Sequence, residues 1–167
     1  WLIKPSADVR DGADVLRSRI GLEAKVEAIL PEMDIYSLFQ QTQAGKCDVI
    51  IVDECQFMTP KQIEQLRAIV DEHNIPVICF GLRTDFLTHL FPVSARLFEV
   101  ADSITEIKTI CTCGRKALFN GRKVNGEYVF EGAQVAIDMQ DCVEYQSMCP
   151  QCYFAEREKF YKKREKV

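Results

Sequence analysis

The chain has 167 residues, of which 47% are hydrophobic and 28% charged, and its formal net charge is −4. This composition is sufficient for one folded core with a small additional subdomain, and it excludes a disordered chain. The acidic balance argues against a nonspecific nucleic-acid binder. No apolar run reaches the roughly 18 residues of a membrane span, and the N-terminus lacks the pattern of a secretion signal. We therefore expect a soluble, cytoplasmic protein that binds neither nucleic acid nor membrane.

Two strands are predicted in the first third of the chain. Residues 1–5 (Trp-Leu-Ile-Lys-Pro) predict a strand that already lies within the fold, and Val49-Ile50-Ile51-Val52 predicts a strand buried on both faces, which is typical of a parallel sheet. The second strand ends at two carboxylates, Asp53 and Glu54. Open α/β sheets bind ligands at the carboxyl ends of their strands, where one acid can hold Mg²⁺ and its neighbour can transfer a proton. The alternative is an acidic pair that only ends the strand in solvent.

A helix is predicted after these acids, because Thr59-Pro60-Lys61-Gln62 has the pattern of a capping box with proline at the first helical position. Apolar residues recur on one face as far as His73-Asn74. Residues 75–81 (Ile-Pro-Val-Ile-Cys-Phe-Gly) then predict another buried strand. A strand, a helix and a strand within about thirty residues form a parallel βαβ unit. Asp53 and Glu54 should therefore lie beside residues 82–86.

Four of the eight cysteines form two closely spaced pairs, Cys111-Thr-Cys113 and Cys149-Pro-Gln-Cys152. Two such pairs are typical of a tetrahedral zinc site, and four thiolates would make that zinc structural. The alternative is four thiols without a metal, and Cys142 is the one plausible substitute ligand. Cys47, Cys55 and Cys79 are interpreted as small apolar core residues.

The segment between the two cysteine pairs has the pattern of β-hairpins. Asn120-Gly121 and Asn125-Gly126 predict turns, and residues 128–130 and 134–137 predict short strands. A β insertion anchored at both ends by metal suits a lid over a ligand, although a purely structural zinc ribbon explains the spacing equally well. The basic cluster from Lys159 to Lys166 is interpreted as a solvated helical tail. The domains expected are residues 1–107 (α/β), 108–153 (zinc-binding β subdomain) and 154–167 (tail).

Four motifs carry a family resemblance over nearly the whole chain: Asp53-Glu54-Cys55-Gln56-Phe57, residues 81–86, residues 107–117, and residues 145–149 with Cys152. In this order they resemble the type II thymidine kinases, and the Cys-x-Cys pair is similar to the proteobacterial branch. The resemblance implies a P-loop NTPase (RecA-like) parallel sheet with a zinc-bearing β subdomain. It also implies transfer of the ATP γ-phosphate to the 5′-hydroxyl of thymidine, in a homotetramer inhibited by thymidine triphosphate.

The resemblance also assigns roles to residues. Glu54 matches the general base, Asp53 the acid that binds Mg²⁺, and Gln56 belongs to the same nucleotide-contacting motif. Asp8 and Arg10 match an Asp-x-Arg near the phosphates. The positions that match the nucleoside pocket and its covering loop are Phe57, Leu82, Phe86, Phe91, Ala136, Ile137 and Tyr145.

The chain departs from the family pattern in two places. Residues 137–145 are longer than the family's glycine-rich turn and contain no glycine. No Gly-x-x-x-x-Gly-Lys-Ser/Thr motif is present, so we expect the phosphate-binding loop to precede Trp1. Two other functions stay open at this point, namely another P-loop ATPase with a zinc ribbon and a noncatalytic zinc-ribbon interaction module.

Overall fold

The structure is a computed structural model that describes residues 1–8, 12, 14–18, 20–134 and 142–165. The chain divides into two compact units, which we call unit 1 (Trp1–Arg83 with Phe91–Asp102) and unit 2 (Thr84–Leu90 with Ser103–Val167). The boundaries at residues 107 and 153 that the sequence suggests stay a prediction.

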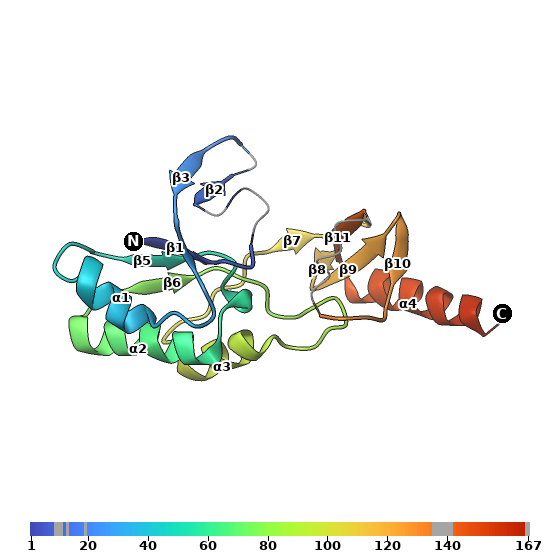
Figure 1. The fold of residues 1–167 in the computed structure, drawn as a ribbon. Helices are drawn as coiled ribbons and strands as arrows, with labels where there is room; N and C mark the ends of the chain where they lie inside the picture. The colour runs from blue at the N-terminus through green and yellow to red at the C-terminus, as the bar shows by residue number, and fades with distance from the viewer. Residues whose placement is uncertain (9–11, 13, 19, 135–141, 166–167) are drawn as a thin grey trace. The chain divides into compact units, whose positions relative to one another are not determined.

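Unit 1 contains a four-stranded parallel sheet in the order β4-β1-β5-β6 (Figure 1). The strands are β1 (Leu2–Pro5), β4 (Glu27–Ile29), β5 (Ile50–Val52) and β6 (Val77–Cys79). Strand β1 pairs with β4 on one side and β5 on the other, so the first residues of the chain lie within the sheet as expected. Strand β5 is parallel to β6, which confirms the βαβ unit and the α/β fold class.

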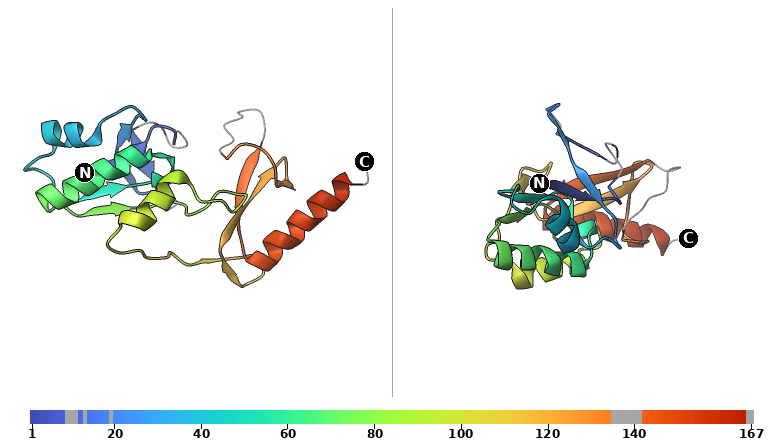
Figure 2. Two further views of the ribbon diagram at one scale, coloured as in Figure 1. Left: turned by 90° about the horizontal axis from the view of Figure 1, so that it is seen from below. Right: turned by 60° about the vertical axis from the view of Figure 1, so that its left-hand side comes forward.

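Helices α1 (Ile35–Thr42), α2 (Pro60–His73) and α3 (Pro92–Val100) cover one face of this sheet (Figures 1 and 2). Helix α2 begins as the sequence predicts, since the Thr59 side chain accepts from the Gln62 amide and the Gln62 side chain accepts from the Thr59 amide. The buried side chains that fill the space between sheet and helices include Ile3, Ile35, Phe39, Ile50, Val52, Ile63, Leu66, Ile69 and Val93.

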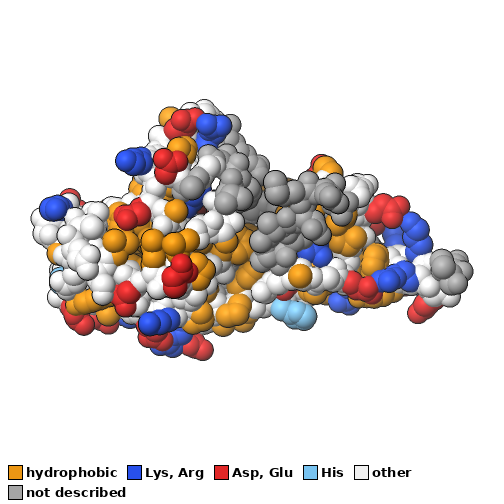
Figure 3. All heavy atoms as spheres, in the orientation of Figure 1, with side chains coloured by type: hydrophobic (Ala, Val, Ile, Leu, Met, Phe, Trp, Pro, Cys, Tyr) orange, Lys and Arg blue, Asp and Glu red, His pale blue; other side chains and the backbone are white. Residues whose placement is uncertain are grey.

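The prediction that the strand over residues 75–81 is buried was wrong. Ile78 and Phe80 are 46% and 42% exposed, and the following Leu82 is 41% exposed. The reason is that β6 pairs only with β5 among the described strands, so it forms an edge of the sheet. Figure 3 shows hydrophobic side chains gathered at the surface over the β5–β6 part of the sheet.

Two smaller elements complete unit 1. Strands β2 (Val15–Arg17) and β3 (Glu23–Lys25) form an antiparallel hairpin, and a 3₁₀ turn, η1 (Cys55–Phe57), follows β5. Among the described residues of the whole chain, no helix is long and apolar enough to cross a membrane.

Unit 2 contains an antiparallel sheet in the order β10-β9-β11, formed by β9 (Phe119–Val124), β10 (Glu127–Val129) and β11 (Val143–Met148). A small pair, β7 (Thr109–Ile110) and β8 (Lys116–Ala117), precedes it, and helix α4 (Pro150–Arg164) follows it. Phe130, Met148 and Tyr153 form its buried centre. The basic C-terminal stretch is helical as expected, with Lys159 and Lys162 exposed and paired with Glu156 and Glu158.

One of the two predicted turns is present. Asn125 and Gly126 join β9 to β10 with φ values of 52° and 84°, as an Asn-Gly hairpin turn requires. Asn120-Gly121 instead lies inside β9, so that turn prediction was wrong. Gly121 occurs there because a Cβ atom would collide with Met148 Sδ and the Tyr128 ring. Residues 128 and 129 are in β10, Gln134 is outside any strand, and residues 135–137 lie outside the described residues.

Candidate functional site

Asp53 and Glu54 follow directly after the carboxyl end of β5 and are both half-buried. At Glu54 the backbone turns through a left-handed conformation, with φ 47° and ψ 37°, before the 3₁₀ turn begins. Residues other than glycine seldom adopt a positive φ, and when they do they are often found at active sites. The expected acidic pair therefore lies at the carboxyl end of a central strand of the sheet, where the backbone bends into the 3₁₀ turn.

Gln56 connects Glu54 to the segment that follows the neighbouring strand β6. Its Nε2 atom donates to Glu54 Oε2 at 2.5 Å, and its Oε1 atom accepts from the backbone amide of Leu82 at 3.0 Å. The Gln56 side chain is only 3% exposed. The predicted proximity of Glu54 and the segment after β6 is confirmed for Leu82, and the buried Gln56 carboxamide connects the two.

Gly81 makes this arrangement possible. A Cβ atom at residue 81 would lie 2.5 Å from Cys55 Sγ and 2.7 Å from Gln56 Oε1, both well inside van der Waals contact. The backbone after β6 thus approaches the 3₁₀ turn more closely than any side chain permits. The sequence motif contains this glycine, but its steric role becomes visible only in three dimensions.

Three of the expected nucleoside-contacting residues lie in unit 1. The rings of Phe57 and Phe91 meet edge to face, with centroids 6.0 Å apart, and Phe91 is 5% exposed. Leu82 is held through its backbone, because Ser94 Oγ donates to Leu82 O at 2.7 Å. These contacts connect the segments after β5 and β6 with the beginning of α3.

Asp8 lies after β1 and is 6% exposed. Its Oδ2 atom is 3.6 Å from the Lys4 ammonium, which also donates to the carbonyls of Gly12 at 2.7 Å and Val15 at 3.0 Å. Lys4 is completely buried, and such a charge is tolerated only when its donors are satisfied. Sequence reasoning missed Lys4, and the expected partner Arg10 lies outside the described residues.

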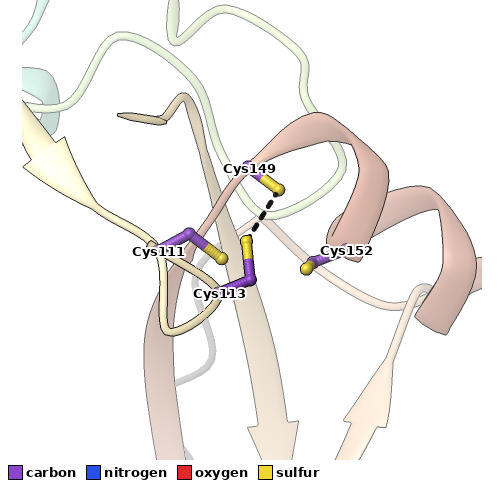
Figure 4. A group of neighbouring side chains, drawn as sticks. All are labelled: Cys111, Cys113, Cys149 and Cys152. Carbon is purple, nitrogen blue, oxygen red and sulfur yellow. Dashed lines mark hydrogen bonds between the residues drawn. The ribbon is translucent and has the colours of Figure 1, made fainter. Parts of the chain in front are cut away.

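The four paired cysteines come together in unit 2, and their sulfur atoms all lie within 4.8 Å of one another. Cys111 and Cys113 extend from the turn between β7 and β8, while Cys149 and Cys152 flank the first turn of α4 (Figure 4). Cys113 Sγ and Cys149 Sγ are 3.5 Å apart. Four sulfurs around a zinc ion at ~2.3 Å would be about 3.8 Å apart, so the group is compatible with a structural metal site.

Backbone amides favour the thiolate form at two of the four cysteines, whereas hydrogen bonds with the neighbouring thiols of Cys113 and Cys149 raise the pKa of Cys152 to about 12. The backbone amides of Cys113 and Cys149 lower the pKa of Cys111 to about 6, which favours the thiolate that a metal requires. The backbone amide of Cys152 likewise lowers the pKa of Cys149. Cys142 is exposed and does not belong to this cluster.

The remaining expected residues belong to unit 2. Phe86 is 2% exposed, and its carbonyl accepts from the Tyr153 hydroxyl at 2.6 Å. Tyr145, in β11, is 53% exposed. Ala136 and Ile137 lie outside the described residues. Sequence reasoning missed Arg122, a buried cation whose guanidinium carbon lies 3.5 Å from the centre of the Phe86 ring.

Comparison with known proteins identifies the family. Residues 1–153 match the family model described as "Thymidine kinase". The chain belongs to the thymidine kinase family. The family resemblance stated from the four motifs is therefore confirmed, and the family accounts for the α/β fold with its cysteine cluster.

Curated members of the thymidine kinase family are similar over most of the chain. A thymidine kinase of Streptomyces avermitilis is 45% identical over 134 residues, which are 78% of this chain and 62% of that protein. One from enterobacteria phage T4 is 40% identical over 138 residues, covering 81% of this chain and 72% of that protein. One from Chromobacterium violaceum is 41% identical over 153 residues, covering 91% and 80%. The chain thus spans between about three fifths and four fifths of these relatives.

Proposed function

We propose that this chain is part of a thymidine kinase that transfers the γ-phosphoryl group of ATP to the 5′-hydroxyl of thymidine, giving dTMP. The observation that carries the proposal is the Glu54–Gln56–Leu82 connection at the end of a central parallel strand, in a chain of the thymidine kinase family. Deoxyuridine analogues, which share the sugar and the pyrimidine, are expected to react as well.

Glu54 is the general base in this proposal. A nucleoside hydroxyl is a weak nucleophile, and a carboxylate within hydrogen-bond reach accelerates phosphoryl transfer by accepting its proton. Gln56 holds Glu54 through the 2.5 Å hydrogen bond, so one carboxylate oxygen has a fixed direction. A carboxylate held in this way loses less rotational freedom when substrate binds.

Asp53 is the residue that would hold Mg²⁺, and Asp8 and Arg10 would contribute to the phosphate region. Asp53 follows the central strand directly, with its amide donating to Ile3 O at 3.0 Å, so its backbone is fixed by the sheet. When bound with ATP, Mg²⁺ offsets charge on the phosphate oxygens. Oxygen ligands of this kind are the ones that Mg²⁺ prefers.

The nucleoside contacts in unit 1 are assigned to Phe57, Leu82 and Phe91, and those in unit 2 to Phe86, Tyr145, Ala136 and Ile137. Aromatic rings offer flat apolar surface to a pyrimidine base at little entropic cost. Leu82 and Tyr145 support this assignment because they are 41% and 53% exposed, which leaves much of each side chain available to a ligand. Phe86 and Phe91 are buried and are assigned from the family resemblance alone.

The metal held by Cys111, Cys113, Cys149 and Cys152 is proposed to be a structural Zn²⁺. Four thiolates leave no open coordination position, so this ion would stabilise unit 2 rather than take part in chemistry. None of the eight cysteines forms a disulfide, which supports a reducing, cytoplasmic location. A homotetramer and inhibition by thymidine triphosphate follow from the family resemblance alone.

Steady-state phosphorylation of thymidine by the full-length protein tests the function. We expect ATP consumption that depends on thymidine and yields dTMP, with deoxycytidine and uridine as weak substrates. Hydrolysis of ATP that is independent of thymidine would favour another P-loop ATPase. An inactive full-length protein that still retains its metal would favour a noncatalytic module.

A further inference from the structure

Arg122 lies in β9, the central strand of the unit 2 sheet, and is 4% exposed. A cation in the interior of a small β subdomain is unfavourable unless its donors are satisfied. Apolar side chains of similar volume usually serve a fold equally well at such positions. Packing alone therefore does not explain why an arginine occupies this position.

Two of those contacts hold the segment that follows β10. Arg122 Nη1 donates to Ala133 O and Nη2 to Glu131 O, both at 2.8 Å. Gly132 lies between these carbonyls with φ +111°, and a Cβ atom there would lie 2.8 Å from Arg122 Nη2. The planar guanidinium donates hydrogen bonds to two carbonyl oxygens at once, which an ammonium group does less well.

The same guanidinium stacks on Phe86, with its carbon 3.5 Å from the ring centre. Cation–π contact of this kind fixes the position of the ring as well as that of the cation. A hydrogen bond nearby connects the same two segments, since Gln134 Nε2 donates to Asp85 Oδ2 at 3.1 Å. Residues 84–90 and 131–134 are thus joined at two adjacent points.

Arg122 also neighbours Tyr145. The two residues are directly opposite in the antiparallel β9–β11 register, so their side chains project from the same face of the sheet. Arg122 therefore has a defined relationship to Phe86, to Tyr145 and to the backbone of Glu131 and Ala133. The two side chains are the nucleoside contacts assigned to the described part of unit 2.

We propose that Arg122 is a positioning residue for the nucleoside: its guanidinium holds the Phe86 ring and the Glu131–Ala133 backbone in the arrangement that binds the pyrimidine. This inference rests on the proposed function, since thymidine is the ligand whose contacts are being positioned. Arg122 acts through these groups and not on the reacting atoms. Its loss should consequently affect the binding of the nucleoside more than that of ATP.

The main alternative is a purely structural role in unit 2. Within the described residues, Arg122 Nε is buried without a hydrogen-bond partner, so this group lowers the stability of unit 2 rather than raising it. The chain offers a matched control in Lys123, the next residue of β9. Lys123 is a cation above the Tyr128 ring, at 4.8 Å, and it faces the opposite side of the sheet.

The test compares Arg122→Met, Arg122→Lys and Lys123→Met in the full-length protein. We expect Arg122→Met to raise KM for thymidine about 10- to 100-fold, the equivalent of one or two charge-assisted hydrogen bonds. KM for ATP and the metal content should stay within about twofold of wild type. Arg122→Lys should recover part of the loss, because it keeps the cation over Phe86, and Lys123→Met should resemble wild type.

Hydrogen exchange without any ligand provides a readout independent of activity. Peptides covering residues 84–90 and 127–134 should exchange faster in Arg122→Met and not in Lys123→Met. An unchanged KM for thymidine in Arg122→Met would overturn the proposal. Equal losses of thymidine binding, ATP binding and metal content would overturn it as well. If Arg122→Met does not fold, Arg122→Lys is used instead. Its KM for thymidine should then rise more, relative to wild type, than its KM for ATP. A wild-type protein inactive on thymidine would refute the proposed function, and an Arg122→Met protein with wild-type exchange would still refute the positioning role separately.

Discussion

Gln56 holds Glu54 and Leu82 together, donating to the carboxylate of one and accepting from the backbone amide of the other. The carboxamide has one donor group and one acceptor group, and both are used in this connection. Because Gln56 is buried, water competes poorly for either hydrogen bond. The candidate base and the expected nucleoside contact therefore have a fixed relationship before any substrate arrives.

Replacing Glu54 with Gln tests the base. Glu54→Gln keeps size and hydrogen bonding but removes the proton acceptor, so kcat for thymidine should fall about 10²- to 10⁴-fold. Thymidine binding, measured by calorimetry on the full-length protein, should barely change. Asp53→Asn serves as the comparison, since it should mainly raise the Mg²⁺ concentration needed for activity. Near-normal turnover in Glu54→Gln would remove the base assignment.

Asp85 is a poor substitute for that base. Its Oδ1 atom accepts from the amides of Leu87 and His89, both at 2.9 Å, and its Oδ2 atom accepts from Gln134. A carboxylate engaged in this way stabilises its own turn. Asp85→Asn should therefore weaken thymidine binding more than it lowers kcat.

Gln56→Leu is predicted to lower kcat about 10- to 100-fold, because it removes the hydrogen bond that orients Glu54 and leaves the Leu82 amide without its acceptor. Metal content should not change, since the cysteine cluster lies in unit 2. Gln40→Leu, at an exposed position of α1, is the matched control and should retain wild-type kinetics. A Gln56→Leu enzyme as active as this control would show that Glu54 is oriented by other groups.

Gly81→Ala is predicted to destabilise unit 1 and reduce activity together. The added Cβ would lie 2.5 Å from Cys55 Sγ and 2.7 Å from Gln56 Oε1, and overpacking of this kind costs about 1–3 kcal/mol. The double variant Cys55→Ala/Gly81→Ala removes the first clash only. It should recover part of the free energy of unfolding, measured by urea denaturation, while the loss of kcat persists. Full recovery of kcat in the double variant would contradict the role given to Gln56.

The features that the sequence predicted correctly depend on residues close together in the chain. Thr59 and Gln62 cap α2 within one turn, and Asn125-Gly126 forms its hairpin locally. The cysteine cluster was predictable despite its long insertion, because each pair carries its own spacing.

The features that were missed depend on distant partners. The exposure of Ile78 follows from which strands flank β6, and Gly121 is explained by Met148 and Tyr128 rather than by a turn. Lys4 and Arg122 are charged residues in strands, and their carbonyl partners lie eight to eleven residues away in the chain. No local pattern distinguishes such buried cations from exposed ones.

Metal removal tests the cysteine cluster. The purified protein should contain one zinc per chain, and Cys149→Ser should release it, because a hydroxyl is a poor ligand where a thiolate is required. Structural zinc contributes on the order of 10 kcal/mol to folding in small peptide sites, so residues 109–134 should lose their protection from hydrogen exchange. The α2 peptides of unit 1 should keep theirs. Cys142→Ser is the matched control, since Cys142 is exposed and outside the cluster, and it should retain zinc. Full zinc content in Cys149→Ser together with loss of zinc in Cys142→Ser would show that Cys142, and not Cys149, is a zinc ligand.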